Sequence, residues 1–380
     1  MKTLLVTRLA LRDFRNIQSL ALRPAPRFNV IAGDNGQGKT SLLEALYALA
    51  TSRSFRTERL KELKRDGTEF ARVDAELLED GQTRTQRVTV TDAARAVFCD
   101  EQRAERLADY AIRTPMVVFH PGDLDLTMGG ATRRRDLLDR VGLFTDPSAA
   151  DDRRRYRHAL RERQKALELR GERAPELDAY EQLVAHHGAR LGQIRERASH
   201  ALAREAEPGF RRLVASNLGF GMRYRPGGEL DPGRFREELV ARRGSDRRRH
   251  TATFGPHKDD LELVIDGRPA RKHASQGQHR ILTLTLKLAE LAAIREARGT
   301  HPILLLDDVS SELDPTRIGA VFDFLSSSPS QVFVTTTRPE LFQTPGAAPG
   351  DRHDYVLDAG ALRAASGAPS ETSREASHGS

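Results

Sequence analysis

Short apolar segments separated by turn residues dominate the first third of the chain. Buried strands typically produce runs of this length and texture. The pattern predicts strands at residues 28–32, 70–78, 84–90 and 116–119, and residues 3–12 alternate more weakly. A Gly-rich turn follows the first buried run, and the apolar segment after it predicts a helix over Ser41–Ala50. The region is therefore expected to be rich in β-structure, with one helix directly after a glycine turn.

The pattern changes near residue 130. Residues 133–207 are rich in Arg, Glu, Ala and Leu, and Pro147 and Pro175 are the only prolines among them. Since proline and glycine interrupt helices, we expect two or three long helices with a break near residues 171–175. The basic residues outnumber the acidic ones over residues 133–173 by 13 to 8.

Strand-like segments return near residue 251. Asp266-Gly267 predicts a hairpin turn, because this dipeptide favours the backbone conformation of a two-residue loop. The expected elements are hairpin strands at 261–266 and 270–273, a helix over Gln276–Arg298, strands at 303–306 and 331–335, and a helix over Pro315–Leu325 between them. The polar, low-complexity residues 361–380 predict a disordered tail.

Composition and charge limit the range of expected partners and compartments but do not identify a function. The 380 residues carry a net charge of +7 with a pI near 9.7, which suits a polyanionic partner such as DNA. Arginine supplies most of that charge, and a GC-rich genome would explain the same skew. A single cysteine, Cys99, and the lack of long apolar runs or a secretory signal lead us to expect a cytoplasmic protein.

The strongest chemical motif follows the strand at 28–32. Its eight residues match G-x-x-x-x-G-K-[ST], and they lie between a predicted strand and a predicted helix, as phosphate binding requires. Glycines permit the loop to turn its backbone N–H groups toward phosphates. We expect Lys39 to contact the β- and γ-phosphates of ATP and Thr40 to bind Mg²⁺. The predicted nucleotide-binding residues are Gly33, Asp34, Asn35, Gly36, Gln37, Gly38, Lys39, Thr40 and Ser41.

Two acids end the apolar strand at 303–306. In a central parallel strand, Asp307 would lie at the carboxyl edge of the sheet beside the glycine loop. Asp307 is therefore the second predicted Mg²⁺ residue, and Asp308 is placed to orient an attacking water. Without the glycine loop, an acid that caps the next helix would explain the pattern equally well.

A third motif, Ser275-Gln276-Gly277-Gln278, precedes the long helix over Gln276–Arg298. A simple helix cap explains it when it stands alone. The order of all the motifs, including Ser310-Ser311-Glu312-Leu313-Asp314 after the two acids, is that of ABC-type ATPases. In such enzymes the serine motif of one subunit caps the γ-phosphate of the nucleotide that the other subunit holds. This order therefore predicts a role for Ser275 in catalysis and for Gln278 in nucleotide binding.

The wide separation of Lys39 from Asp307 favours the SMC-like class, in which a helical arm is inserted between the motifs. The predicted fold is α/β, an ABC-type (SMC-like) P-loop ATPase head with mixed β-sheet lobes and an inserted helical domain. We expect residues 1–128 and 251–360 to form the two-lobed head, and residues 129–250 to form the helical insertion.

At this level the chain resembles the RecF family of DNA replication and repair proteins up to about residue 340. Beyond the glycine loop and the motifs around Ser275 and Asp307, further segments carry the resemblance. They are Leu11-Arg12-Asp13-Phe14-Arg15-Asn16, Val118-Phe119-His120-Pro121-Gly122-Asp123-Leu124, Arg133-Arg134-Arg135 with Leu138-Asp139, and Phe254-Gly255-Pro256-His257-Lys258-Asp259-Asp260-Leu261.

The resemblance implies an ATP-dependent homodimer that binds single- and double-stranded or gapped DNA and hydrolyses ATP slowly. It also implies a role with RecO and RecR in loading RecA. Three positions depart from the general ABC pattern. His120-Pro121 stands where a Mg²⁺-contacting Gln is usual, Thr335-Thr336-Thr337 replaces the switch histidine, and Asp308 replaces a Glu. The shorter acid is consistent with slow hydrolysis.

Other functions are less consistent with these motifs. The ATP-binding subunit of a membrane transporter is the main alternative, but the wide motif spacing and the missing switch histidine argue against it. A fused nuclease has no room after Asp307, and a small-molecule kinase would not explain Ser275-Gln276-Gly277-Gln278. For the basic insert, two interpretations stay open: a DNA-facing surface, or solvated helices whose Arg residues pair with nearby acids.

Overall fold

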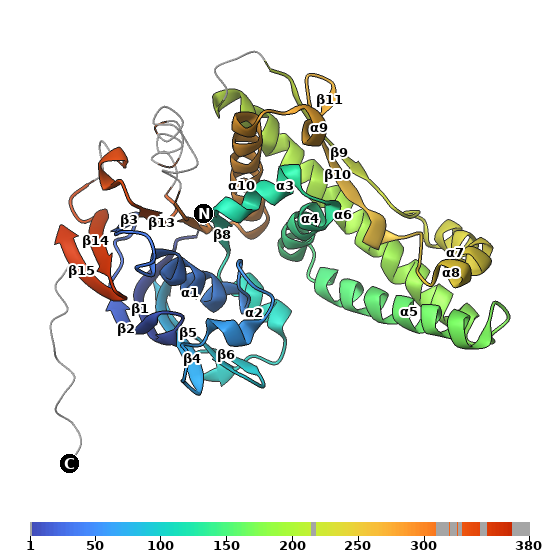
Figure 1. Cartoon of the computed structure of the whole chain (residues 1–380), viewed down its shortest axis with the longest axis horizontal. Helices are drawn as coiled ribbons and strands as arrows, with labels where there is room; N and C mark the ends of the chain where they lie inside the picture. The colour runs from blue at the N-terminus through green and yellow to red at the C-terminus, as the bar shows by residue number, and fades with distance from the viewer. Residues whose placement is uncertain are drawn as a thin grey trace. The chain divides into compact units, whose positions relative to one another are not determined.

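The computed structural model describes residues 2–213, 218–308, 319, 325, 329–342 and 348–366. The chain forms two compact units (Figure 1). The first unit combines Met1–Asp123 with Gly299–Ser380, and the second comprises Leu124–Arg298.

The first unit contains two six-stranded sheets. One is antiparallel, in the order β2-β1-β4-β5-β6-β7, and the other runs in the order β15-β14-β3-β13-β12-β8. Its elements are β1 (Leu4–Phe14), β2 (Ile17–Leu22), β3 (Phe28–Ala32), α1 (Lys39–Thr51), the 3₁₀ turn η1 (Leu60–Leu63), β4 (Phe70–Glu79), β5 (Gln82–Thr91), β6 (Arg95–Cys99), β7 (Gln102–Arg103), α2 (Leu107–Arg113), β8 (Met116–Phe119), β12 (Ile303–Leu306), β13 (Val332–Thr336), the 3₁₀ turn η4 (Pro339–Leu341), β14 (Arg352–Asp358) and β15 (Ala361–Ser366).

The second sheet positions the predicted chemistry. Strands β14, β3, β13, β12 and β8 are parallel neighbours, with β13 between β3 and β12. Their carboxyl ends therefore share one edge, where the glycine loop follows β3 and Asp307 follows β12. Helix α1 contacts strands of both sheets, and almost every residue of it is buried, which explains its nearly continuous apolar sequence.

The second unit is largely helical and includes a three-stranded sheet in the order β11-β10-β9. Helix α6 contacts α4, α5, α7 and α10, so it is the central helix against which the others of the unit pack. The elements are α3 (Asp125–Met128), α4 (Ala131–Thr145), α5 (Ala149–Arg170), α6 (Leu177–Leu213), β9 (Phe220–Arg225), α7 (Pro232–Ala241), α8 (Arg243–Arg249), the 3₁₀ turn η3 (Pro256–Lys258), β10 (Asp260–Ile265), β11 (Arg268–Pro269), α9 (Ala270–His273) and α10 (Gln276–Arg298).

Most predicted elements are confirmed, including the strand at 28–32, the helix after the glycine loop and the helices on both sides of residues 171–175. Two details are wrong. Residues 270–273 form a helical turn, because β11 ends at Pro269, which has no N–H for a longer ladder. Residues 361–366 are not disordered but pair antiparallel with β14. Apart from residues 319 and 325, the predicted helix Pro315–Leu325 lies outside the described residues, as does the tail beyond residue 366.

The two compact units divide the chain at other boundaries than the predicted domains: the first unit ends at Asp123 rather than at residue 128, and its second part begins at Gly299 rather than at residue 251. Residues 251–298 belong to the second unit, whereas the sequence assigned them to the head. The reason is local packing: β10 pairs with β9, and α10 packs along α6.

Candidate functional site

The glycine loop has a backbone that other residues would strain. Gly36 and Gly38 have φ angles of 84° and 106°, in the region that glycine adopts without a steric cost. Gly33 lies against β14, where an added Cβ would be 2.4 Å from the carbonyl oxygen of Leu357. Helix α1 begins at Lys39, so the loop ends at a helix N-terminus, which favours an anion.

Lys39 is folded back onto this loop. Its Nζ donates hydrogen bonds to the carbonyl oxygens of Gly33, at 2.6 Å, and Asp34, at 2.8 Å. Burial lowers the pKa of the Lys39 ammonium, although Asp308, Asp307 and Asp34 act in the opposite direction. The ammonium is thus held beside the loop, among carboxylates that preserve its charge.

Thr40 and Asp307 meet across the sheet edge. The Thr40 hydroxyl donates to Asp307 Oδ1 at 3.0 Å, and Thr335 Oγ1, on strand β13 between β3 and β12, donates to the same oxygen at 2.7 Å. Thr335 Oγ1 also accepts the backbone N–H of Asp308 at 3.0 Å. Burial raises the pKa of Asp307, and the two hydroxyl hydrogen bonds oppose that shift.

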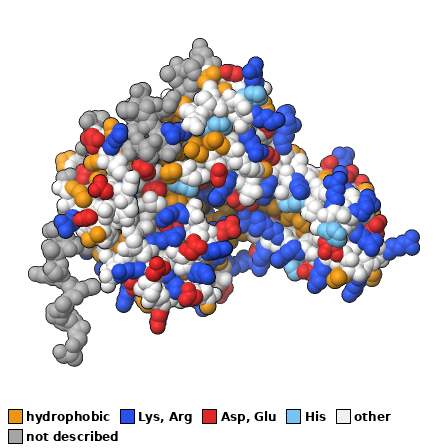
Figure 2. Space-filling view, in the orientation of Figure 1, with side chains coloured by type: hydrophobic (Ala, Val, Ile, Leu, Met, Phe, Trp, Pro, Cys, Tyr) orange, Lys and Arg blue, Asp and Glu red, His pale blue; other side chains and the backbone are white. Residues whose placement is uncertain are grey.

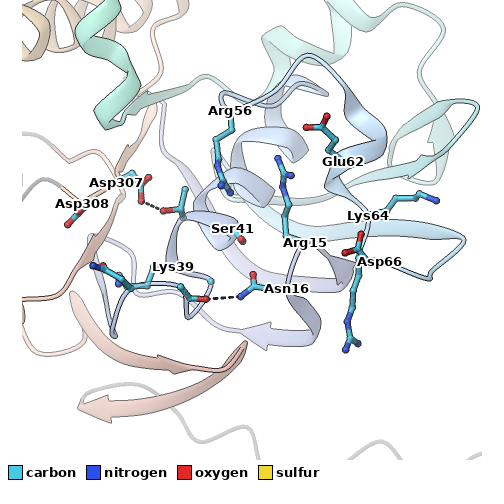
Figure 3. A pocket seen from close by; sticks show the side chains of 15 residues that line it. Arg15, Asn16, Lys39, Ser41, Arg56, Glu62, Lys64, Asp66, Asp307 and Asp308 are labelled. Atoms are coloured by element: carbon cyan, nitrogen blue, oxygen red, sulfur yellow. Dashed lines mark hydrogen bonds between the residues drawn. The ribbon is translucent and has the colours of Figure 1, made fainter.

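These groups face a cavity of about 840 Å³ that lies within the first unit (Figure 3). Arg15, Arg56, Asp307 and Asp308 contribute side chains to it, together with residues of the glycine loop. Asn16 also lines it, and the side of η1 contributes Glu62, Lys64, Arg65 and Asp66. Cationic and anionic groups therefore converge on one space large enough for a nucleotide.

A buried carboxylate on α1 organises the two arginines. Glu44 is fully buried, and Arg15 donates to it through Nε and Nη2 at 2.9 and 2.8 Å. Arg56 donates to Glu44 Oε2 at 3.3 Å, and the Ser54 hydroxyl donates to Oε1. One carboxylate thus orders two guanidinium groups at the cavity wall, and an ordered pair of guanidinium groups favours a phosphate ligand.

The structure brings most of the predicted residues together. Those that line the cavity are Asn35, Gly36, Gly38, Lys39, Thr40, Ser41, Asp307 and Asp308. Gly33 and Asp34 hold Lys39 through their carbonyl oxygens. Gln37 is engaged elsewhere, because its side-chain and backbone oxygens accept from the N–H groups of Ala359 and Gly360 in the β14–β15 turn.

Ser275 and Gln278 belong to the second unit and are not among the described residues that line this cavity. They form a reciprocal cap at the start of α10: Ser275 N donates to Gln278 Oε1 at 2.7 Å, and Gln278 N donates to Ser275 Oγ at 3.3 Å. Ser275 is exposed. The simple helix-cap interpretation is therefore structurally present, and the exposed serine stays available to a further ligand.

The three departures from the ABC pattern have structural consequences. His120 follows β8 at the same sheet edge, where its ring packs against Phe55 and its backbone N–H donates to Asp123. Thr335 occupies part of the segment that replaces the switch histidine, and it anchors Asp307 and Asp308. The motif Ser310–Asp314 lies outside the described residues.

Sequence reasoning gave no role to Glu44, Arg56 or Thr335. Glu44 offered one signal, since it is an acid within an otherwise apolar helix. Its partner Arg15 is 29 residues away in sequence, so only the folded chain shows the pairing. Asn16 was quoted for the family resemblance, and its amide donates to the carbonyl oxygen of Gly36 at 3.3 Å.

The comparisons with known proteins agree with this geometry. A family model described as "RecF/RecN/SMC N terminal domain" matches residues 5–349. A protein named "DNA replication and repair protein RecF" from Anaeromyxobacter sp. (strain Fw109-5) is 40% identical over 93% of this chain and 97% of its own length. The chain belongs to the RecF family. A second relative of that name, from Myxococcus xanthus, is 39% identical over 90% of this chain and 93% of its own length.

The fold of this chain is also similar to solved structures of RecF and of a related head domain. The structure titled "Structure of the recombination mediator protein RecF-ATPrS in RecFOR pathway" matches with a TM-score of 0.85 and 25% identity, covering 95% of this chain and 98% of that one. A Smc head domain from Pyrococcus furiosus matches with a TM-score of 0.55 at 17% identity, covering 96% of both chains, which shows a shared fold. The predicted ABC-type, SMC-like fold is thereby confirmed.

Two features are absent from the described ranges of the chain. Within these ranges no helix has the length and hydrophobicity needed to cross a membrane. In the same part of the chain, no group of three or more His, Cys, Asp or Glu side chains is arranged to hold a metal ion by itself.

Proposed function

We propose that this RecF-family chain is an ATP-dependent DNA-binding protein of recombinational repair and replication restart. The observation that carries the proposal is the meeting of Lys39, Thr40 and Asp307 at one sheet edge, beside a cavity of nucleotide size. ATP would lie with its phosphates on the glycine loop and near Lys39. The relative whose structure title names an ATP analogue supports this assignment, since its fold covers nearly the whole chain.

The same edge fits Mg²⁺. Thr40 and Asp307 offer a hydroxyl and a carboxylate oxygen, and hard oxygen ligands are those that Mg²⁺ prefers. A cation beside Asp307 would also offset the burial that disfavours its ionised form. Bound there, Mg²⁺ would neutralise charge on the phosphates. Asp308, which Thr335 holds through its backbone N–H, would orient the attacking water, and its short side chain suits slow, DNA-stimulated hydrolysis.

The second half of the mechanism is a shared site. Ser275 and Gln278 lie at an exposed helix N-terminus, where a partial positive charge favours an anion. In the dimer that we propose, they contact the γ-phosphate of the ATP bound to the glycine loop (the P-loop) of the partner subunit and so complete that site. A two-fold axis would create two such sites. ATP then favours the dimer by its differential affinity for the two states, and hydrolysis releases it.

DNA bound to both protomers would be held while ATP persists. We propose RecO- and RecR-type proteins as partners, since one related structure is described as part of the RecFOR pathway. We propose that residues 1–128 act as the two-lobed head together with residues 251–360, of which 251–298 pack in the second compact unit, and that such a protein acts in the cytoplasm. The transporter alternative is not favoured, because the relatives that cover most of the chain are named as replication and repair proteins.

A complementation assay tests the shared site. Lys39→Met should remove ATP from a protomer's own P-loop, and Ser275→Arg should leave a protomer unable to close its partner's site. Each variant alone should be inactive. An equal mixture should recover hydrolysis, because Ser275 of the Lys39→Met protomer can close the P-loop of the Ser275→Arg protomer. The recovered rate should be at most half that of the unmodified protein, since one of two sites works.

Two controls make the assay decisive. Lys39→Met mixed with a second batch of Lys39→Met should stay inactive. A Ser275→Arg protein that hydrolyses ATP at the normal rate by itself would contradict the shared site, as would a mixture no more active than its components.

A further inference from the structure

The described arginines of the second unit fall into two groups. Many are held by carboxylates, including exposed ones on α6: Arg197 pairs with Asp146 at 2.9 Å, and Arg211 pairs with Glu207 at 2.7 Å. Arg190 and Arg204 are bound in the same way, by Asp152 and Glu296. These residues fit the interpretation of solvated helices whose charges are internally balanced.

The second group has no ion pair with a described carboxylate; it includes single exposed residues such as Arg155 and Arg212, and six cations that lie together on α5 and α8. All six are exposed, and none makes an ion pair with a carboxylate of the described chain. We call this set the α5–α8 basic surface; its members are Arg157, Arg161, Lys165, Arg247, Arg248 and Arg249. Nearby cations without counter-charges repel one another, so the arrangement costs stability in the free protein.

Geometry joins the six into one surface. Arg157, Arg161 and Lys165 recur every four residues, which places them on one side of α5. Asp246 fastens α8 beside that helix: Arg163 donates to its carboxylate at 2.7 Å, and Gln164 donates to its carbonyl oxygen at 3.3 Å. Figure 2 shows Lys and Arg side chains over the region of α5 and α8.

The surface continues to the end of α5. A Cβ added to Gly171, the C-cap of α5, would lie 3.8 Å from the guanidinium group of Arg247. At the other end, Arg157 lies close to Arg153, and the nearby carboxylates of Asp139 and Asp136 partly offset the charge of Arg157. On the α8 side, Glu168 faces His250 at 3.8 Å, and Glu172 lies near Arg248 beside Gly244 without forming an ion pair with it. The cations thus lie along one edge with little compensation.

We propose that the α5–α8 basic surface binds the phosphate backbone of duplex DNA, an inference that rests on the DNA binding proposed above. Residues 157 to 165 span about 12 Å of helix, a length over which duplex DNA presents several phosphates. Five of the six cations are arginines, whose planar donors suit phosphate oxygens. Protein partners usually require aromatic anchors beside arginine, whereas this set contains cations only.

Arg133–Arg135, another basic run of the helical unit, do not form a comparable free surface. Arg134 is buried and binds both carboxylate oxygens of Asp260, at 2.7 and 3.0 Å. Arg135 donates to the carbonyl oxygen of Asp259 at 2.9 Å. A triple neutralisation of residues 133–135 would therefore damage the fold rather than remove only a DNA contact.

The test compares three variants of the full-length chain, and the control removes the same number of cations as the α8 variant. One variant carries Arg247→Gln, Arg248→Gln and Arg249→Gln, and a second carries Arg161→Gln and Lys165→Gln. The control carries Arg197→Gln, Arg204→Gln and Arg211→Gln, which also removes three exposed cations, but ones that have carboxylate partners. Binding to two unrelated 30-base-pair duplexes is measured with ATP at several salt concentrations, alongside ATP affinity and thermal unfolding.

We expect the α8 variant to bind both duplexes at least tenfold more weakly near 0.1 M salt. Its slope of log affinity against log salt should fall by roughly two to three, about 0.9 for each lost phosphate contact. The α5 variant should lose roughly one to two units of slope, and the control should stay close to the unmodified protein. ATP affinity should be the same in all.

Two results would overturn the inference in distinguishable ways. If the unmodified protein binds duplex DNA but the α8 variant matches the control, this surface is not the DNA contact, and an acidic protein partner becomes its better explanation. If the unmodified protein binds no duplex at any salt concentration, the proposed DNA-binding function itself fails, and this inference fails with it.

Discussion

Buried charge is used differently in the two units. In the first unit, Glu44 is fully buried, yet its partners Arg15 and Arg56 line an open cavity. In the second unit, Arg195 is buried together with its partners, donating to Asp139, Asp259 and the carbonyl oxygen of Pro256. The arginines of the first cluster are held by Glu44 and also face a cavity, so we call this network open. In the second cluster the guanidinium group bonds only to buried protein groups, so we call this network closed.

The contrast separates two kinds of ion network that look alike in sequence. A closed network satisfies its own donors, so its removal damages the fold. An open network leaves charge facing a cavity, so its natural complement is an external ion, here the polyphosphate of ATP. Burial of charge alone therefore does not identify a functional site; the cavity beside it does.

The closed network predicts the largest loss of stability. Arg195→Met should lower the free energy of unfolding by about 3–5 kcal/mol, because it leaves buried carboxylates without a counter-charge. The matched control on the same helix is Arg197→Met, whose exposed pair with Asp146 contributes about 0–1 kcal/mol. Urea denaturation measures both. Equal losses in the two variants would remove the distinction between closed and exposed networks.

This prediction has a pH dependence with a definite sign. Burial would raise the pKa of Asp139, but Arg195 and Arg153 together hold it below the ordinary value of 3.8. The contribution of Asp139 to stability is therefore present above pH 3.8 and is lost as the pH falls through its lowered pKa. The difference between Arg195→Met and the unmodified protein should narrow over that acidic range.

The open site predicts loss of binding without loss of folding. Lys39→Met should weaken ATP binding at least about 100-fold, since hydrogen bonds to charged groups contribute about 1.5–3 kcal/mol each. Lys61→Met, an exposed cation in η1, serves as the control and should bind ATP normally. Titration calorimetry with Mg-ATP separates them. Normal affinity in the Lys39→Met protein would show that the glycine loop is not the nucleotide site.

The sequence predicted the parts of the fold that depend on local pattern. The strand at 28–32 and the helix after it follow from an apolar run and a glycine loop, and the break between α5 and α6 follows from Gly171 and Pro175. It did not predict β14, because that mixed polar strand is specified by its distant neighbour β3. For the same reason, residues 361–366 read as tail until their pairing with β14 is known.

The site residues also divide into those that sequence motifs predict and those that only the tertiary structure shows. Lys39, Thr40 and Asp307 belong to motifs with a fixed order, so their meeting was predictable. In the sequence, Thr335 stands out only because it lies in the segment where a switch histidine is usual. Its hydrogen bonds to Asp307 and Asp308 depend on β13 lying between β3 and β12. Glu44 and Arg15 required the tertiary structure, since no local rule joins a helix residue to a turn that precedes it.

Sedimentation velocity shows whether ATP joins two protomers through Ser275. The unmodified protein should sediment as a monomer without nucleotide and as a dimer with Mg-ATP. Ser275→Arg should remain a monomer at saturating ATP while it still binds the nucleotide, and Asp308→Asn should accumulate as the dimer because it cannot complete hydrolysis. A Ser275→Arg protein that forms the ATP-dependent dimer as readily as the unmodified protein would contradict the account.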